Sequence, residues 1–234
     1  MAGSCGRERA VIRAVVFDFD GVLVESVSVK TEAFRSLFSP EGPEVAARIV
    51  AYHLAHGGVS RMEKFRYAYE HILRRPLFAS ELQALSDRFK QLVFDGVLRA
   101  PWVPGALDAL EAVQCRGWLA FVVSGTPEDE LRDLVARRGV ARFFAGVYGS
   151  PATKSELLRR MLDGHGLQRG HTLMVGDALT DYEAAKATGI SFVARRTTDA
   201  AGLWEALDVP VVDDLTALAR AWDEYSIEQE ARIS

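Results

Sequence analysis

A short apolar run that ends in two acids constrains this chain more than any other segment. Residues 15–23 read Val-Val-Phe-Asp-Phe-Asp-Gly-Val-Leu, so that Asp18 and Asp20 are two positions apart. Alternate residues of an extended strand point to the same side, and two carboxylates held there repel each other. Such a pair is stabilised by a cation between the acids or by protonation of one of them. Because ligands of open α/β sheets bind at the carboxyl ends of strands, we expect a functional site here.

Short apolar runs alternate with helical patterns along most of the chain, which predicts βαβ units and a parallel sheet. We expect strands at 11–19, 118–123, 144–148, 172–175, 190–194 and 209–212. We expect helices at 105–116, 128–138, 154–164, 180–188 and 215–224. The predicted fold class is therefore α/β, with a Rossmann-like parallel-sheet core.

The segment 26–100, which we call the helical insertion, breaks this alternation. Its apolar residues recur at helical spacing throughout, and Pro40, Pro43, Gly57-Gly58 and Pro76 separate the helices. It is too long for a simple loop. We therefore predict two domains: an α/β core formed by 1–25 and 101–234, and an α-helical domain inserted at 26–100.

The composition of the 234-residue chain bounds the classes of partner. A net charge of −4 gives no reason to expect a nucleic acid or an anionic membrane surface, and no apolar stretch is long enough to span a membrane. The first nine residues lack the apolar core of a signal peptide, and Cys5 and Cys115 do not form a disulfide framework. We expect a cytoplasmic protein, and the sequence leaves its oligomeric state open.

A second polar segment, Ser124-Gly125-Thr126, follows the apolar run 118–123. A hydroxyl and exposed backbone N–H groups at a strand-to-helix turn suit a phosphate oxygen. Alternatively, Ser124 caps the helix that begins at Glu128, and for Thr126 we favour this helix-capping role. Lys154 lies in the first turn of a predicted helix, where the helix dipole disfavours a cation, so a nearby anion would explain it.

Asp177 and Asp181 follow the apolar run 172–175 across a strand-to-helix turn. Acids at a helix N-terminus are favourable on dipole grounds alone. Together with Asp18 and Asp20, however, they would supply the hard oxygen ligands that Mg²⁺ prefers. No Cys/His cluster suggests zinc, and we expect the five histidines at the surface or in the helical insertion.

These segments, in this order, resemble the motifs of the haloacid dehalogenase-like (HAD) hydrolase superfamily. The resemblance implies that Asp18 is a nucleophile that forms an aspartyl-phosphate and that Asp20 is the general acid/base. It also implies that Ser124, Gly125 and Lys154 bind the phosphate. Mg²⁺ would be bound by Asp18, Asp177 and the backbone carbonyl of Asp20, with Asp181 as a further ligand or a neighbour. An insertion at 26–100 resembles the helical cap of one branch of this superfamily.

The loop His56-Gly57-Gly58-Val59-Ser60-Arg61 resembles the substrate-specificity loop of members with a helical cap. We therefore expect Gly58 to allow close approach of the backbone to the substrate and Arg61 to pair with an anionic group. The alternative is an ordinary helix–helix turn with Arg61 facing solvent.

The resemblance implies an Mg²⁺-dependent phosphatase that hydrolyses a small phosphorylated metabolite, such as a sugar phosphate or phosphoglycolate. Asp20 favours phosphate esters as substrates, because the dehalogenases and phosphonate hydrolases of the superfamily lack an aspartate at this position. One alternative is a phosphosugar mutase of the β-phosphoglucomutase type, favoured by Gly-Val-Ser-Arg but opposed by Lys30, where the mutases carry a histidine. An alternative of another class is a non-catalytic binding protein on the same scaffold, and the complete set of aspartates argues against it.

Overall fold

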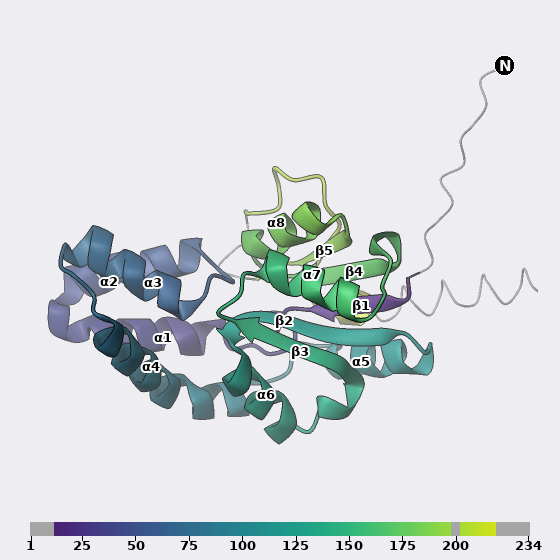
Figure 1. Ribbon diagram of the computed structural model, residues 1–234, viewed down its shortest axis with the longest axis horizontal. Helices are drawn as coiled ribbons and strands as arrows, with labels where there is room; N and C mark the ends of the chain where they lie inside the picture. The colour runs from purple at the N-terminus through teal and green to yellow at the C-terminus, as the bar shows by residue number, and fades with distance from the viewer. Residues whose placement is uncertain (1–11, 198–201, 219–234) are drawn as a thin grey trace, which may run out of the picture.

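A six-stranded parallel sheet forms the centre of the protein in the computed structural model, which describes residues 12–197 and 202–218 (Figure 1). The strands are β1 (Ala14–Phe17), β2 (Leu119–Pro127), β3 (Phe144–Ser150), β4 (Thr172–Gly176), β5 (Ser191–Arg195) and β6 (Val211–Val212). Their order across the sheet is β3-β2-β1-β4-β5-β6. The predicted Rossmann-like α/β class is therefore confirmed.

The register of the three central strands brings the polar segments to one edge. Phe17, the last residue of β1, pairs with Val122 on β2 and with Val175 on β4. Residues that follow these positions leave the sheet side by side because the strands are parallel. The carboxyl edge of the sheet is thus where the acids after β1 and β4 meet the turn after Val123.

Two layers of helices cover the sheet. They are α5 (Ala106–Cys115) and α6 (Glu128–Arg137) on one face, and α7 (Lys154–Gly164) and α8 (Leu179–Thr188) on the other (Figure 1). Alternate residues of β1 serve the two faces: Phe17 belongs to the apolar cluster with α5 and α6, whereas Val16 packs with α7 and α8. Burial on both faces explains why this strand reads as a continuous apolar run.

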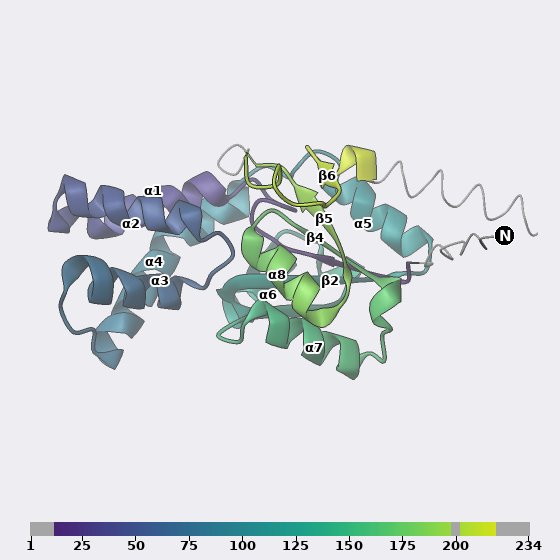
Figure 2. The ribbon, with the colours of Figure 1, turned by 90° about the horizontal axis from the view of Figure 1, so that it is seen from above.

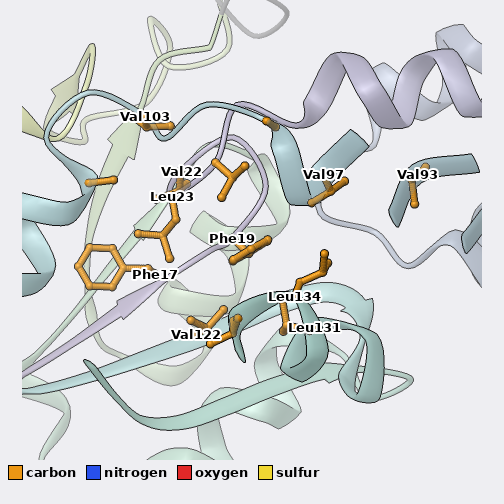
Figure 3. Close-up of a cluster of buried hydrophobic side chains, with 14 of the residues drawn as sticks. Phe17, Phe19, Val22, Leu23, Val93, Val97, Val103, Val122, Leu131 and Leu134 are labelled. Carbon is orange, nitrogen blue, oxygen red and sulfur yellow. The ribbon is translucent and has the colours of Figure 1, made fainter. Parts of the chain in front are cut away.

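Four α-helices of the helical insertion lie beyond the carboxyl edge of the sheet (Figure 2). They are α1 (Val27–Phe38), α2 (Pro43–Ala55), α3 (Arg61–Tyr67) and α4 (Ala79–Arg99). Phe34, Phe65 and Phe89 form their aromatic centre, with ring centroids 4.7–5.9 Å apart. Figure 3 shows how Val93 and Val97 of α4 continue this apolar packing toward Phe19 and α6.

The two connections between the sheet and the helical insertion run side by side. Val24 on the outgoing connection forms β-bridges both to Asp20 and to Trp102 on the returning one. Arg138, at the end of α6, places its guanidinium 3.9 Å from the centre of the Trp102 ring. The same guanidinium donates to the carbonyls of Val97 and Leu98, each at 2.8 Å. The end of α4 is thereby tied to the end of α6 and to the returning connection.

The predicted elements differ from the observed ones mainly at their ends. Strand β1 stops at Phe17 because the residues after it turn out of the sheet, whereas β2 continues to Pro127. Helix α7 has the predicted bounds and begins with a capping box formed by Thr153 and Glu156. The helix predicted at 215–224 falls largely outside the described residues. No helix in the described ranges is long and apolar enough to cross a membrane.

Helix α5 offers a matched test of the core. Leu110 is fully buried against the sheet, whereas Leu107, one turn earlier, is 37% exposed. Leu110→Ala should lower the free energy of unfolding by about 2–5 kcal/mol, because it removes buried methyl groups and leaves a cavity. Leu107→Ala should cost less than about 1 kcal/mol. Chemical denaturation of both variants checks this, and equal losses would contradict the assignment of the buried face.

Candidate active site

Asp18 is held in place at the end of β1 by two donors. It is 3% exposed, and its Oδ1 accepts a hydrogen bond of 2.7 Å from the backbone N–H of Phe19. Its Oδ2 lies 2.9 Å from Nζ of Lys154, the first residue of α7. The anion that the sequence suggested near Lys154 is therefore this carboxylate, together with that of Asp181.

Three carboxylates gather at this point, and we call Asp18, Asp177 and Asp181 the acidic cluster. One oxygen of each lies within 4.8 Å of the others. Asp181 accepts a hydrogen bond from Lys154 through Oδ1 and one of 3.1 Å from the N–H of Ala178 through Oδ2. The cluster thus gathers three carboxylates, the oxygen ligands that a hard divalent cation prefers, beside the ammonium of Lys154.

Burial controls the ionisation of the acidic cluster. It raises the pKa of Asp18 from 3.8 to about 6, with Asp181 and Asp20 adding to the rise and Lys154 opposing it. The pKa of Asp177 is raised well above its ordinary value by burial and by the charges of Asp18 and Asp181. Burial by itself would lower the pKa of Lys154, but these aspartates raise it, so this lysine stays charged. A cation beside Asp18 and Asp177 would offset their mutual repulsion.

A glycine allows the first loop to approach the acidic cluster. Gly21 has φ +79°, and a Cβ built on it would lie 2.2 Å from Oδ2 of Asp177. Arg195, at the end of β5, donates to the carbonyl of Gly21 at 2.9 Å and forms an ion pair with Glu25. The loop after β1 therefore lies against Asp177, and Arg195 of strand β5 holds it there.

Asp20 belongs to a separate group of polar side chains. Its carboxylate accepts hydrogen bonds from Ser26 at 2.6 Å and Thr126 at 3.1 Å, and it forms an ion pair with Lys30. Lys30 also donates to Thr126 at 2.8 Å. Burial alone would raise the pKa of Asp20, but Lys30 and these hydrogen bonds lower it. The side chain of Asp20 thus lies outside the acidic cluster, which leaves its backbone carbonyl for the predicted metal role.

The prediction that Thr126 caps helix α6 is wrong. The N-cap position is Pro127, without a side-chain hydrogen bond, and the Thr126 hydroxyl contacts Asp20 instead. Ser124 is buried, and its Oγ accepts from the N–H of Thr126 at 3.2 Å, so it does not cap α6 either. Ser124 and Gly125 both line the cavity beside Asp18. Lys30 and Thr126 are the neighbours of Asp20 that sequence reasoning did not place.

The glycine loop of the helical insertion rests on the sheet domain. Thr180 donates from its hydroxyl to the carbonyl of Gly57 at 2.9 Å. A Cβ on Gly58, which has φ +73°, would lie 2.1 Å from the Thr180 hydroxyl and 3.1 Å from Lys154 Nζ. A Cβ on Gly125 would lie 2.3 Å from the carbonyl of Gly58. The expected close approach of Gly58 is thus to the core itself, directly above Lys154.

Arg61 is buried, so its alternative interpretation as a solvent-facing residue is wrong. Its guanidinium forms a two-point ion pair with Glu130 on α6, with one hydrogen bond of 3.3 Å and a second shorter one. Nε donates to Ser86 at 3.1 Å, and the group lies 5.4 Å from the centre of the Phe89 ring. The anion that Arg61 contacts is therefore a residue of this chain.

A cavity of about 690 Å³ lies between the carboxyl edge of the sheet and the helical insertion, beside the contacts that join them. Its walls combine the catalytic candidates with aromatic and cationic side chains of the insertion; they include Asp18, Asp20, Ser124, Asp177, Lys30, Phe34, His53, Gly58, Arg61, Lys64 and Phe89. His53 lies in the helical insertion, as expected of a histidine here, but Lys64 was not singled out by its sequence. A ligand in this cavity would contact both parts of the chain.

The site therefore lies at the carboxyl edge of a Rossmann-like α/β fold, with a buried aspartate after the first strand, a lysine beside it and further acids after β4. A family model described as haloacid dehalogenase-like hydrolase matches residues 15–195. The chain belongs to this family.

Sequence relatives and a solved structure are consistent with membership of this family. The chain is 30% identical to a phosphoglycolate phosphatase of Rhodospirillum rubrum over 77% of its own length and 78% of that protein. It is 26% identical to the phosphoglycolate phosphatase of Aliivibrio fischeri, over 76% and 81% of the two chains. The structure of CbbY from Rhodobacter sphaeroides in complex with xylulose-1,5-bisphosphate shares the fold, with a TM-score of 0.71, 16% identity, and coverage of 87% and 95%.

The ion pair between Arg61 and Glu130 should contribute to stability mainly through the charge it compensates. Arg61→Met leaves Glu130, which is 3% exposed, without its partner, and we expect a loss of about 3–5 kcal/mol in the free energy of unfolding. The double variant with Glu130→Met should recover most of that loss. Arg35→Met, which breaks an exposed pair with Glu32, should change stability by less than about 1 kcal/mol. An additive double variant would contradict the coupling.

The raised pKa of Asp18 predicts a pH dependence of stability. Between 3.8 and about 6 the folded state binds a proton that the unfolded state releases, so the wild type loses stability as pH rises through this window. Asp18→Asn lacks this loss. In chelator, its free energy of unfolding relative to wild type should rise by about 2–3 kcal/mol from pH 4 to pH 7. A difference that stays constant or falls with pH would refute the raised pKa.

Proposed function

We propose that this protein is an Mg²⁺-dependent phosphatase that hydrolyses a small phosphomonoester through an aspartyl-phosphate. The observation that carries the proposal is the Asp18 carboxylate, held by Lys154 within the acidic cluster and bordering the cavity of about 690 Å³. The phosphoglycolate phosphatases among the relatives support the same class of reaction.

In the first displacement, Asp18 attacks the phosphorus atom. The hydrogen bond from Phe19 and the contact with Lys154 fix the two oxygens of the nucleophile. In this proposal, Lys154, the Ser124 hydroxyl and the backbone N–H of Gly125 would offset negative charge on the phosphoryl oxygens. Asp18 and Asp177 would bind Mg²⁺, which supplies positive charge that keeps the nucleophile ionised and neutralises the phosphate.

Asp20 moves the proton. It gives a proton to the leaving alkoxide in the first displacement and takes one from the attacking water in the second. Its ion pair with Lys30 favours the ionised carboxylate, which is the form required for the second step, so Asp20 must take up a proton when the substrate binds in order to serve as the acid of the first step. Thr126 and Ser26 hold both oxygens of the carboxylate in position.

The helical insertion, residues 26–100, acts in this proposal as a cap domain over the core formed by 1–25 and 101–234. The seating of Gly57 and Gly58 on Thr180 and Gly125 would exclude water from the reacting phosphate. Exclusion of water favours transfer of the phosphoryl group from the substrate to Asp18 over its direct hydrolysis. A water molecule must then enter the site for the second displacement.

A phosphosugar mutase is the second candidate, because the loop from Gly58 to Arg61 matches that of the β-phosphoglucomutases. Two contacts argue against it. Lys30 rather than a histidine accompanies Asp20, and Arg61 is already paired with Glu130. Release of inorganic phosphate from a sugar phosphate supports a phosphatase, whereas conversion to an isomer without phosphate release supports a mutase.

The proposal predicts phosphate release from p-nitrophenyl phosphate that requires Mg²⁺. Asp18→Asn should lower kcat by at least about 10³-fold while the protein stays folded, because the isosteric amide is neither a nucleophile nor a charged ligand. Thermal melting provides the control for folding. Turnover within tenfold of wild type would remove Asp18 as the nucleophile, and full activity in excess chelator would remove the metal.

A further inference from the structure

Three cations of the helical insertion line the cavity, and they differ in what balances their charge. Lys30 pairs with Asp20, and Arg61 pairs with Glu130. Lys64 has no carboxylate within ion-pair distance in the described ranges 12–197 and 202–218, although it is only 4% exposed. A buried ammonium without an anion is costly. Its charge is the one that the described residues leave uncompensated in this cavity.

The surroundings of Lys64 are built to hold its amine in one place. Nζ donates to Nδ1 of His53 at 2.9 Å and to the His53 carbonyl at 3.2 Å. Nε2 of His53 then carries the ring proton and donates to the Thr31 hydroxyl at 3.2 Å, and Thr31 donates to the Val27 carbonyl. The donation from Lys64 to Nδ1 leaves the proton of the neutral imidazole on Nε2, which fixes its tautomer.

The third N–H of a charged Lys64 lacks a partner in the described part of the chain. Phe34 lies beside it, with the ring centre 5.8 Å from Nζ, and Phe89 lines the same cavity. Burial, together with the charges of Lys30 and Lys154, lowers the pKa of Lys64 to about 7. An anion at this end of the cavity would reverse this and satisfy the remaining donor.

Arg61 is the other cation that a substrate anion could approach, and its donors are already engaged. Nε donates to Ser86, and both terminal nitrogens donate to Glu130. A substrate anion would have to compete with a buried carboxylate for this guanidinium. No such competition arises at Lys64, so the geometry favours the lysine.

We propose that Lys64, oriented by His53, recognises a second anionic group on the alcohol portion of the substrate. This inference rests on the proposed function and names its substrate class: phosphomonoesters whose leaving alcohol carries a carboxylate or another phosphate. Asp18 and Lys154 would bind the transferred phosphate at one side of the cavity. Lys64 would bind the second anion at the side formed by the helical insertion.

Matched pairs of substrates test this proposal, because the members of each pair differ only in the remote group. The carboxylate pairs are 2-phosphoglycolate with 2-hydroxyethyl phosphate, and 5-phosphoribonate with ribitol 5-phosphate. The phosphate pair is ribitol 1,5-bisphosphate with ribitol 5-phosphate. In wild type with Mg²⁺, kcat/KM should favour the anionic member of at least one pair by about 30-fold or more. The preferred pair then distinguishes a carboxylate from a phosphate.

Lys64→Met should reduce that preference to less than about threefold, since removal of the ammonium lowers kcat/KM mainly for the anionic member of the pair. Lys64→Gln provides a second neutral variant, and Lys90→Met, at an exposed position on α4, should keep the wild-type preference. A wild type without preference in any pair, or a preference that survives in the neutral variants, would overturn the inference. A wild type that hydrolyses none of the compounds with Mg²⁺ would instead overturn the proposed function.

Discussion

The contact of one ammonium with two buried carboxylates is the interaction on which the site depends. Lys154 reaches Asp18 and Asp181 from the start of α7, and the three groups come from three separate strand-to-helix connections. Without the lysine, the carboxylates after β1 and β4 would face each other with no compensating ammonium or guanidinium in contact among the described residues. The sheet brings the acids together through its register, and the lysine makes that arrangement tolerable electrostatically.

The same constraint explains why the helical insertion is so closely tied to the sheet domain. Gly58 lies directly over Lys154, and Gly125 lies beneath the Gly58 carbonyl, so the charged site is shielded by backbone rather than by side chains. Arg61 and Glu130 add a buried pair of opposite charges across this interface. Shielding from water strengthens every charge interaction below it, which is useful only where charge is rearranged during a reaction.

Sequence reasoning predicted the sheet and the motif positions well because period, apolar runs and turn residues are local signals. The bounds of helix α7, predicted at 154–164, and the helical character of 26–100 follow from such signals. The partners of Arg61, Asp20 and Lys64 do not, because each contact joins residues whose proximity depends on how the helical insertion packs. Thr126 shows the limit most clearly: its spacing suits a helix cap, and only the position of Lys30, 96 residues earlier, explains its hydroxyl.

The paired connections between the two parts have a mechanical consequence. Val24 and Trp102 are bridged to each other, Arg195 ties the outgoing connection to β5 through Glu25, and Arg138 clamps the returning one. Two backbone segments that are joined side by side resist twisting and sliding past each other more than they resist bending together. We therefore expect any opening between these helices and the sheet to bend both connections together about one axis. Such an opening would bring the same residues of the glycine loop back to the same positions beside Lys154.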